Sequence, residues 1–497
     1  MAANPRAAAV AALVRQEQDG FSNLVLDAEL KRQQLEGRDK AFASAIFYTV
    51  LEHRGTLDYI LCQFLPKGLA KLDAPVREIL RAALAQARYM QVPVSAAVNE
   101  AVKLTRAFKK SSASGLVNAV LRKACSYDLS TASFKNEVER LMVLGSAGRD
   151  VAEFLHKNYP DEALDILTYK ADGGMTSLRA NPLKGSADEL CAKLLASGAK
   201  EAKRGIVPGS VLAKFEGSPA EHPLFKEGCF HVEGQASQLA ALCVEAKPGD
   251  TVLDLCAAPG GKSSQLAAAL QGQGLLVSNE YVAARAEILK SNLERMGVSN
   301  AVVLNETPAR IAAALPEFFD RVLVDAPCSG EGMFRKEPAA LAQHCEALVK
   351  QCAELGADIL DSAAAALAPG GELVYSTCTF APEEDEGQVA AFLQRHPEFT
   401  LADVLGNVDY TFGSEGEANR TGGLPLDVSK VRRIWPCQGG EGHFMARLVK
   451  AGTPRVLPAE GEYTAEEQLW LAAAEAAGKK AKGKGGKPAK TPDARSA

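Results

Sequence analysis

The stretch Thr251-Val252-Leu253-Asp254-Leu255-Cys256-Ala257-Ala258-Pro259-Gly260-Gly261-Lys262 (residues 251–262) determines the class of fold. Its apolar start, 251–255, is typical of a buried strand, the small residues that follow form a turn, and Ser263 begins a helix. This order lets a ligand lie close to backbone amides at the helix N-terminus. A βα turn that needs small residues only for packing would have a similar composition, so the turn by itself does not establish a ligand site.

Glu280 lies twenty residues beyond Gly260, at the end of the next predicted strand. A carboxylate in this place can accept the protons of both ribose hydroxyls, so the turn and Glu280 together predict a nucleoside-cofactor site. The turn has neither the GxGxxG pattern of NAD-binding proteins nor a Walker A sequence. A ligand that contains a ribose but no pyrophosphate therefore fits best.

Strands and helices alternate from Asp250 onward. This alternation predicts a Rossmann-like α/β domain, in which helices cover both faces of a parallel sheet and the site lies at the carboxyl ends of the strands. Two later segments are expected to add an antiparallel hairpin. The predicted strands are 251–255, 275–278, 301–304, 321–324 and 372–376, the long helix is 339–368, ended by Pro369-Gly370-Gly371, and the hairpin joins 431–435 to 443–449.

Two of the predicted strands are each followed by a cysteine. Cys328 follows 321–324, with the carboxylate of Asp325 beside it, and Cys378 follows 372–376. A single cysteine is usually a small buried hydrophobe, but two at the ends of neighbouring strands are expected to share the sheet edge with the glycine turn. The eleven cysteines form no CxxC pair, so we expect neither a disulfide framework nor a metal site, and the thiols are available for chemistry.

The chain of 497 residues is long enough for several domains. The patterns predict an all-helical domain over 1–140, a small α+β subdomain over 150–235 and the Rossmann-like domain over 236–452. Residues 453–497 are expected to form a helix and a disordered basic tail. No apolar run approaches the roughly 18 residues that a membrane span requires, so we expect a cytoplasmic protein without membrane contact.

The net charge of −5 is unevenly distributed. Residues 1–150 carry 21 basic and 15 acidic residues, and 479–497 carry seven basic and one acidic, which leaves −17 for the middle of the chain. Two basic ends suit a polyanionic partner, although surface charge also varies by chance. The densest basic cluster of the helical domain comprises Lys103, Arg106, Lys109, Lys110, Arg122 and Lys123.

Three runs resemble the motifs of a known enzyme family. LDLCAAPGGK (253–262), DAPCSGEG (325–332) and YSTCTF (375–380) are similar to the cofactor, proline-cysteine and threonine-cysteine motifs of S-adenosylmethionine-dependent RNA cytosine-C5 methyltransferases, the Nol/Nop/Sun family. The helical front resembles the NusB-like RNA-binding domain of the RsmB branch of that family, through GRDKAF, LDAPVREILR, VPVSAAVNEAV and GLVNAVLRK. The resemblance extends from about Pro5 to Lys450.

The resemblance implies a role for each of four side chains. Cys378 would attack C6 of the cytosine, and Asp325 would contact N3 and stabilise the adduct. Cys328 would assist release, and Lys262 would orient Asp325 or the base. Thiolate suits this step because its addition at C6 is reversible and makes C5 nucleophilic. The resemblance also implies S-adenosylmethionine as cofactor, bound by Cys256, Ala257, Ala258, Pro259, Gly260, Gly261, Lys262, Glu280, Asn305 and Asp325.

Two segments depart from the family pattern, and three others resemble further segments of it. Asn305-Glu306 stands where relatives offer an acidic residue to the adenine, and either side chain can take that role. Val232-Glu233-Gly234-Gln235 replaces a Gln-Asp or Gln-Glu pair. Residues 333–338 and 435–444 resemble the RsmF branch, whereas the front resembles RsmB. Leu178-Arg179-Ala180-Asn181 resembles the Arg-x-Asn segment with which the family's small subdomain contacts RNA.

The activity implied is methylation of cytosine C5 in small-subunit 16S ribosomal RNA by a monomer without a metal. A transfer RNA target is the nearest alternative. Another is a catalytically inactive RNA-binding assembly or antitermination factor, which the intact Cys328, Cys378 and Asp325 disfavour. A DNA cytosine-C5 methyltransferase is disfavoured because those enzymes are expected to attack with the cysteine of the fourth-strand loop.

Four acidic residues follow Cys378 closely. The N-terminus of a helix directly after Cys378 would lower the pKa of the thiol, but acidic charges in the first turn oppose ionisation. We hypothesise that these acids face solvent and cap the helix dipole, and that substrate binding activates the thiol. The acids are Glu383, Glu384, Asp385 and Glu386.

Overall fold

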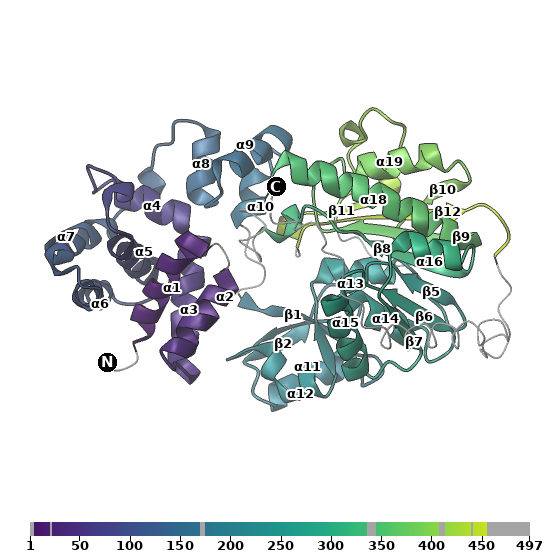
Figure 1. Cartoon of the computed structure of the whole chain (residues 1–497), viewed down its shortest axis with the longest axis horizontal. Coiled ribbons are helices and arrows are strands. Elements are labelled where there is room, and N and C mark those ends of the chain that lie inside the picture. Colours follow the sequence, from purple (N-terminus) through teal and green to yellow (C-terminus); the bar gives the residue numbers. More distant parts are fainter. Residues whose placement is uncertain are drawn as a thin grey trace, which may run out of the picture.

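The front of the chain folds as a bundle of helices around one apolar core. In the computed structural model, which describes residues 4–19, 22–168, 174–334, 344–406, 413–438 and 441–454, this bundle forms the left lobe of Figure 1. Phe47, Ile79 and Leu121 are completely buried in its core. Its helices are α1 (Pro5–Asp19), α2 (Ser22–Arg32), α3 (Gly37–Glu52), α4 (Arg54–Cys62), α5 (Ala74–Tyr89), α6 (Val94–Ala107) and α7 (Ser114–Ala124).

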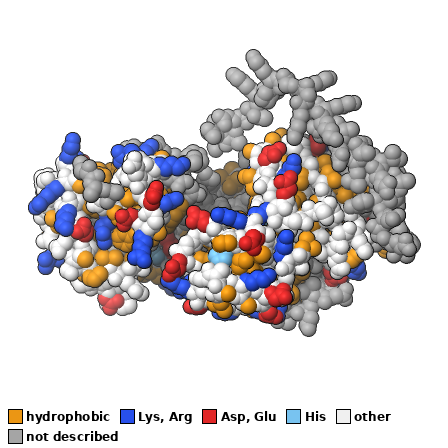
Figure 2. Space-filling view, turned by 90° about the horizontal axis from the view of Figure 1, so that it is seen from below, with side chains coloured by type: hydrophobic (Ala, Val, Ile, Leu, Met, Phe, Trp, Pro, Cys, Tyr) orange, Lys and Arg blue, Asp and Glu red, His pale blue; other side chains and the backbone are white. Residues whose placement is uncertain are grey.

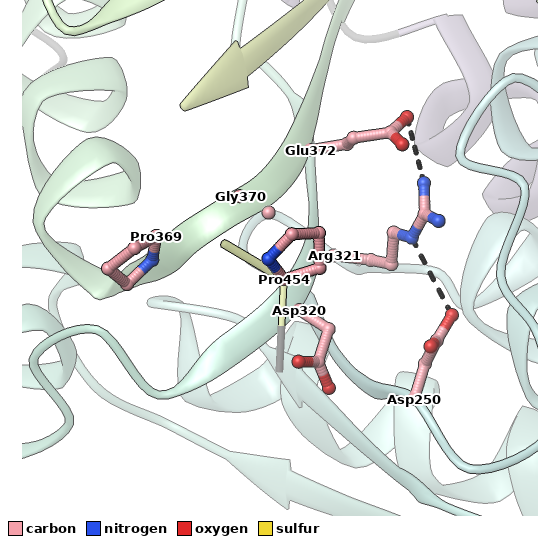
Figure 3. Close-up of a pocket in the computed structure, with 8 residues that line it drawn as sticks. Asp250, Asp320, Arg321, Pro369, Gly370, Glu372 and Pro454 are labelled. Carbon is pink, nitrogen blue, oxygen red and sulfur yellow. Dashed lines mark ion pairs between the residues drawn. The ribbon is translucent and has the colours of Figure 1, made fainter. Parts of the chain in front are cut away.

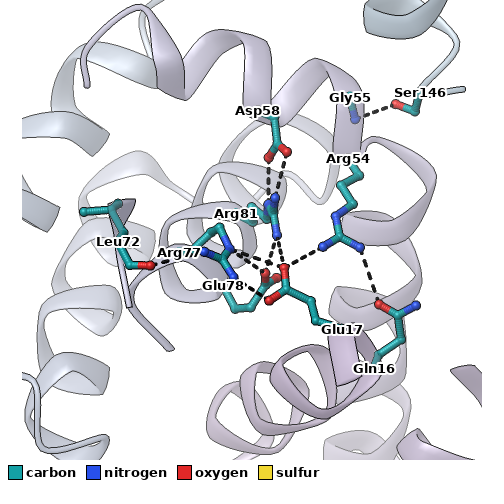
Figure 4. A network of polar contacts seen from close by, with 10 residues as sticks. All are labelled: Gln16, Glu17, Arg54, Gly55, Asp58, Leu72, Arg77, Glu78, Arg81 and Ser146. Atoms are coloured by element: carbon teal, nitrogen blue, oxygen red, sulfur yellow. Dashed lines mark hydrogen bonds and ion pairs between the residues drawn. The ribbon is translucent and has the colours of Figure 1, made fainter. Parts of the chain in front are cut away.

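A network of buried charges joins α1, α4 and α5 of this bundle (Figure 4). Arg81 donates to both carboxylate oxygens of Asp58 at 2.7 Å and to Glu17 at 2.9 Å, and it also binds Glu78. Although burial opposes ionisation, hydrogen bonds from Arg77 and Arg81 lower the pKa of Glu17 to about 2. Burial raises the pKa of Glu78 to about 7. Arg81 therefore contacts all three acids, Asp58, Glu17 and Glu78.

Three further helices lie between the two lobes of Figure 1. They are α8 (Glu137–Leu144), α9 (Arg149–Asn158) and α10 (Ala163–Thr168). On one side, the Thr56 hydroxyl donates to the carbonyl of Val143 at 2.5 Å. On the other side, their apolar residues pack with Phe334, Phe380 and Trp435 of the α/β lobe. These helices connect the bundle to the region around Cys378.

The predicted α+β subdomain is an antiparallel sheet covered by helices. The strand order is β2-β3-β1-β4, and the Ser186 hydroxyl caps α11, the main covering helix. Leu178, Val211 and Phe230 are completely buried between sheet and helix. The elements are β1 (Thr176–Ala180), α11 (Ala187–Ala196), β2 (Glu201–Arg204), β3 (Ser210–Lys214), α12 (Pro223–Lys226) and β4 (Phe230–Val232).

The second lobe contains the predicted Rossmann-like sheet. Its strands follow the order β10-β12-β9-β8-β5-β6-β7, parallel from β9 to β7, and β11 pairs with β12. Both faces are buried, as the continuous apolar runs predict. The strands are β5 (Thr251–Asp254), β6 (Leu275–Asn279), β7 (Ala301–Leu304), β8 (Phe319–Asp325), β9 (Leu367–Thr377), β10 (Phe399–Ala402), β11 (Arg432–Ile434) and β12 (His443–Lys450).

Helices cover the two faces of this sheet. One face packs against α16, α18 and α19, and the other packs against α13 and α14, with α15 beside them. Among the described residues, no helix is both long enough and apolar enough to cross a membrane. The helices are α13 (Gln235–Leu242), α14 (Gly261–Ala269), α15 (Ala283–Met296), α16 (Pro308–Ala314), α18 (Glu346–Ala366) and α19 (Glu386–Arg395).

Two features of this lobe differ from the sequence prediction. The long helix ends at Ala366, before Pro369-Gly370-Gly371, because the chain joins β9 already at Leu367. The predicted hairpin of β11 and β12 forms, but β10, which was not predicted, also pairs with β12, so β12 is an interior strand. Residues 339–343 of the predicted helix, and 455–497 with the predicted tail, lie outside the described residues.

The amino-terminal edge of the parallel strands is held by ion pairs (Figure 3). Arg321 donates to Glu372 at 2.8 Å and lies 3.6 Å from Asp250, so it links the beginnings of three chain segments. The pocket beside it has a volume of only about 100 Å³. A nucleoside needs more room than this, so we do not place the predicted cofactor site at this edge.

We predict that Arg81→Leu destabilises the helical lobe strongly. The substitution leaves Asp58, Glu17 and Glu78 without their shared cation, and breaking a buried ion pair on one side costs about 3–5 kcal/mol. Urea unfolding should show this loss. The matched control is Arg149→Ala, because Arg149 forms an exposed pair with Glu153 that is worth less than about 1 kcal/mol. Equal losses in the two variants would contradict the role given to Arg81.

Candidate active site

The glycine turn connects β5 to α14 at the carboxyl edge of the sheet. Gly260 caps α14 with a φ of +106°, a conformation that favours glycine. A Cβ at Gly261 would lie 2.8 Å from the carboxylate of Glu233, so this position also needs glycine. Asp254, at the end of β5, accepts from Ser263 at 2.6 Å, and burial raises its pKa to about 7. The conformation of the turn is thus fixed by Gly260, Gly261 and the hydrogen bond between Ser263 and Asp254.

Glu280 and Asn305 lie beside this turn, at the ends of β6 and β7. The Glu280 carboxylate is buried, and one oxygen accepts from the Val282 amide at 2.8 Å while the other lies 3.3 Å from Arg285. The Asn305 amide group donates to the carbonyls of Glu280 at 2.7 Å and Tyr281 at 2.8 Å. A fixed, buried carboxylate next to the glycine turn fits the hydroxyls of a ribose.

The two predicted cysteines meet at the same edge. The Sγ atoms of Cys328 and Cys378 are 3.2 Å apart, and the Cys378 amide donates to the Cys328 sulfur at 3.3 Å. Both thiols are free and half-buried. The hydrogen bond with Cys378, together with burial, raises the pKa of Cys328 well above its usual value. Cys328 therefore keeps its proton at neutral pH and can donate it to the sulfur of Cys378.

Asp325 connects the cysteine loops to the glycine turn. One of its oxygens accepts from Lys262 at 2.7 Å, and the other accepts from the Ser376 hydroxyl at 2.7 Å. Although burial opposes both charges, each partner stabilises the other, so the pKa of Asp325 is lowered and that of Lys262 is raised. The pair is a carboxylate and an ammonium at neutral pH. Lys262 thus orients Asp325, as the resemblance implies.

The hypothesis that the four acids after Cys378 face solvent is wrong for three of them. Glu383 is exposed, but Glu384, Asp385 and Glu386 are buried. Helix α19 begins only at Glu386, eight residues beyond Cys378, so its N-terminus does not adjoin the thiol.

Each of the three buried acids has a partner. Glu384 accepts from the Ser329 amide at 2.9 Å, and Asp385 accepts from Thr377 at 2.6 Å. The completely buried Arg433 lies 3.1 Å from Asp385 and also binds Glu386. This arginine supplies the countercharge that solvent would otherwise have to provide.

The Arg-x-Asn segment of β1 does not face outward. Arg179 donates to Glu233 at 2.9 Å and to the carbonyl of Gly261 at 3.2 Å, and both Arg179 and Asn181 are 2% exposed. Asn181 donates to the carbonyls of Gly228 and Met296 at 2.8 Å. The expected RNA contact of these two side chains is therefore wrong for this structure. They fasten the small subdomain to α14 and α15.

The basic cluster of the helical domain does face solvent. Lys103, Arg106 and Lys109 are exposed on and just after α6, and Arg122 and Lys123 are exposed on α7. Lys and Arg side chains gather at the left end of Figure 2, where α6 and α7 lie in Figure 1. This end of the molecule is available to a polyanion.

Sequence reasoning missed His443 as a site residue. It begins β12, is 3% exposed and lies near Lys262 and Asp325, whose charges act on it. A single histidine carries no motif of its own, and the pairing of 443–449 with 372–376 was not predicted. The resemblance of residues 435–444 to the RsmF branch was the signal that could have found it.

The fold and this edge define a class I methyltransferase that takes S-adenosylmethionine as its methyl donor. Residues 241–449 match the model of the family described as 16S rRNA methyltransferase RsmB/F, and residues 3–126 match that of the NusB family. The chain belongs to the RsmB/F family of ribosomal RNA methyltransferases.

The individual relatives include both type B and type F methyltransferases. The probable ribosomal RNA small subunit methyltransferase B of Bacillus subtilis is 31% identical over 79% of this chain and 88% of that protein. The ribosomal RNA small subunit methyltransferase F of Cronobacter sakazakii is 39% identical, but over 49% of this chain and 48% of its own length. The full-length similarity is to type B proteins, while the more similar half-length match is to type F proteins.

Solved structures show the same fold. The crystal structure of PH0851 covers 90% of this chain and all of that chain, with a TM-score of 0.69 and 26% identity. A methyltransferase homologue from Pyrococcus horikoshii covers 64% of this chain and all of its own, with a TM-score of 0.55 and 26% identity.

We predict that Glu384→Gln stabilises the protein at high pH but not at low pH. Burial raises the pKa of Glu384 to about 7, above its value of about 4.3 in an unfolded chain. The folded state binds this proton more tightly, so the stability that Glu384 contributes is present at low pH and is lost as the pH rises through 7. Glutamine keeps an acceptor for the Ser329 amide but cannot ionise.

Thermal melting followed by circular dichroism tests this. Relative to wild type, Glu384→Gln should raise Tm by at least about 2 °C at pH 8.5 and change it little at pH 5. The control is Glu383→Gln, at the exposed neighbour, for which no pH-dependent difference is expected. A Tm difference for Glu384→Gln that is the same at both pH values would argue against the buried, protonated carboxyl.

Proposed function

We propose that this chain methylates C5 of a cytosine in small-subunit 16S ribosomal RNA, acting as a monomer, through a covalent bond between Cys378 and C6. The observation that carries the proposal is the 3.2 Å contact between the sulfurs of Cys328 and Cys378, beside the Lys262–Asp325 pair. One thiol can add to a pyrimidine, the second can assist release, and the carboxylate can stabilise the adduct. The names of the relatives support the small-subunit target.

The thiolate of Cys378 begins the reaction because C5 of cytosine is a poor nucleophile. Its sulfur bonds to C6, the electrons of the C5–C6 double bond form a C4–C5 double bond, and those of the N3–C4 double bond move to N3. N3 takes the proton that the Cys378 thiol gave up, and the Asp325 carboxylate stabilises the protonated N3 by accepting a hydrogen bond. C5 is now enamine-like and can take up a methyl group. The C5 proton then passes to water, the C5–C6 double bond forms again, and the bond between sulfur and C6 breaks as N3 returns its proton to the sulfur.

Cys328 suits the release step. Its raised pKa keeps it a thiol at neutral pH, so it can donate a hydrogen bond to the sulfur of Cys378 as that sulfur leaves with negative charge. In this mechanism the attack on C6 uses Cys378 alone, whereas release uses both cysteines.

S-adenosylmethionine, when bound, supplies an electrophilic methyl group. The buried Glu280 carboxylate is placed to accept from the ribose hydroxyls, and Asn305 holds the backbone on which Glu280 sits. The glycines of the turn have no side chain, and a Cβ at Gly261 would lie 2.8 Å from the carboxylate of Glu233. The full set proposed to hold the cofactor is Cys256, Ala257, Ala258, Pro259, Gly260, Gly261, Lys262, Glu280, Asn305 and Asp325.

The RNA contacts are proposed to lie mainly on the helical lobe. The exposed basic cluster of α6 and α7 can bind phosphates, which orient the RNA without reading its sequence. The C5 edge of a stacked base is out of reach of the buried sulfurs, so the target base must be unpaired or extruded, at a cost of a few kcal/mol. A loop of a partly assembled ribosomal subunit meets this condition.

We predict that Cys378→Ala abolishes methylation while RNA binding is retained. Without the nucleophile the reaction should slow by at least about 1000-fold, as in other enzymes that lose theirs. Tritium transfer from labelled S-adenosylmethionine to 16S RNA, with bisulfite mapping of the product, measures this. Cys345→Ala, at an exposed cysteine, is the control and should retain full activity. Substantial methylation by Cys378→Ala would exclude this residue as the nucleophile.

We predict that Cys328→Ala traps the covalent adduct. Attack by Cys378 remains possible, but the departing sulfur loses its hydrogen-bond donor, so the protein stays bonded to RNA. A slowly migrating band on a denaturing gel, formed only when S-adenosylmethionine is present, would reveal it. The double variant Cys328→Ala/Cys378→Ala is the control and should give no band. If Cys328→Ala gives none either under turnover conditions, Cys328 has no part in release.

A further inference from the structure

His443 lies beside the end of β9, the strand that leads to Cys378. β12 runs antiparallel to β9, with Phe444 opposite Thr377 and Met445 opposite Ser376. Directly opposite residues of antiparallel strands point to the same face, and so does every second residue of one strand. His443 therefore shares a face with Met445 and Ser376, and Ser376 is the residue that holds Asp325.

The imidazole of His443 is buried and incompletely bonded. The residue is 3% exposed, and its Nε2 atom has no hydrogen-bond partner among the described residues. Burial and the nearby charge of Lys262 lower its pKa to about 4, against the opposing effect of Asp325. The ring is neutral at neutral pH and keeps one nitrogen lone pair. A buried polar atom without a partner costs about 1–3 kcal/mol, which a ligand at this position would recover.

The backbone before His443 is tied to the cysteine loops. The Gly442 amide donates to the carbonyl of Gly332 at 3.4 Å, and the Gly332 amide donates to the carbonyl of Cys378 at 2.9 Å. A Cβ at Gly442 would collide with the Phe380 ring and with Gly332, so the strand packs closely against the loop that carries Cys378. The position of the imidazole relative to the sulfur is thus fixed by backbone contacts.

We propose that His443 recognises the exocyclic amino group of the target cytosine by accepting a hydrogen bond at its unpaired ring nitrogen. This inference rests on the proposed function, because it assumes that the base lies between Cys378 and Asp325. The polar edge of cytosine presents an oxygen acceptor, the ring nitrogen N3 and the amino donor. Lys262 is a donor that suits the oxygen and Asp325 serves N3, which leaves the amino group to the neutral imidazole.

The assignment makes His443 a specificity residue. Uracil carries an oxygen where cytosine has the amino group, so it would place a lone pair against the lone pair of the imidazole. A site built to bond a polar group rejects an analogue that lacks it, since the buried partner is then left unpaired. His443 would thus favour cytosine over bases without the amino group at the step of binding and adduct formation.

The experiment compares two RNA oligonucleotides that differ only at the target base. One contains cytidine, and the other contains the riboside of 2-pyrimidinone, which lacks the amino group. The ratio of kcat/KM for the two is measured for wild type, His443→Phe and His443→Asn, with His156→Phe at an exposed histidine as control. Differences in intrinsic base reactivity cancel when the ratio of each variant is divided by that of wild type.

We expect His443→Phe to shift the ratio by about 10-fold or more against cytidine, because phenylalanine fills the space but cannot accept. His443→Asn, which retains an acceptor, should keep most of the preference, and His156→Phe should match wild type. Thermal melting shows which variants are folded. If His443→Phe is unstable, the ratio of kcat/KM for His443→Asn still tests the inference.

Two results would overturn the inference. One is an unchanged ratio in a folded His443→Phe protein that has lost activity equally on both RNAs. The other is accumulation of the covalent adduct in that variant, which would assign His443 to proton removal after attack. Wild-type protein that methylates no cytidine RNA would instead overturn the proposed function on which the inference rests.

Discussion

The ion pair between Lys262 and Asp325 is the contact on which the candidate site depends. It joins the first turn of α14 to the end of β8, with 2.7 Å between Nζ and the carboxylate oxygen. Ser376, from the end of β9, holds the other oxygen of Asp325. Three segments that are distant in sequence are therefore fixed around one carboxylate. Because both charges are buried, removal of either would leave the other unpaired, which is much more costly than loss of a surface pair.

A second set of buried charges supports the chain beyond Cys378. Arg433 from β11 lies among Asp385, Glu386 and the carbonyl of Phe380, to which it donates at 3.1 Å. The Tyr159 hydroxyl donates to the same carbonyl. The acids that follow the cysteine are thus part of the scaffold of its loop, and they do not serve as a solvent-exposed cap.

Tyr159 also shows how the two lobes are linked. It lies at the end of α9, in the helical connector, and its ring packs among Phe380, Trp435 and Phe154. The basic cluster of α6 and α7 is thereby joined through α8, α9 and α10 to the loop of the cysteine. The proposed RNA contacts of the helical lobe and the proposed chemistry at the sheet edge thus lie on one connected body.

Much of the fold could be predicted from the sequence, and so could the residues that meet at the site. Short apolar runs and helical patterns placed β5 to β9, and the rule that parallel strands end at one edge brought Cys328, Cys378 and Asp325 together. Strand β10 was missed because a short edge strand has a weak pattern. The burial of Glu384, Asp385 and Glu386 was missed because sequence alone does not show that Arg433 supplies their countercharge.

The sequence by itself determined which elements form and at which edge the sulfurs gather, because both follow from local patterns and from the topology of parallel sheets. Only the tertiary structure decided which polar groups are paired. Arg179 joins the small subdomain to α14, and His443 is a buried imidazole whose Nε2 atom has no hydrogen-bond partner among the described residues. Partners of buried charges come from distant segments, and their burial depends on packing that no local pattern records.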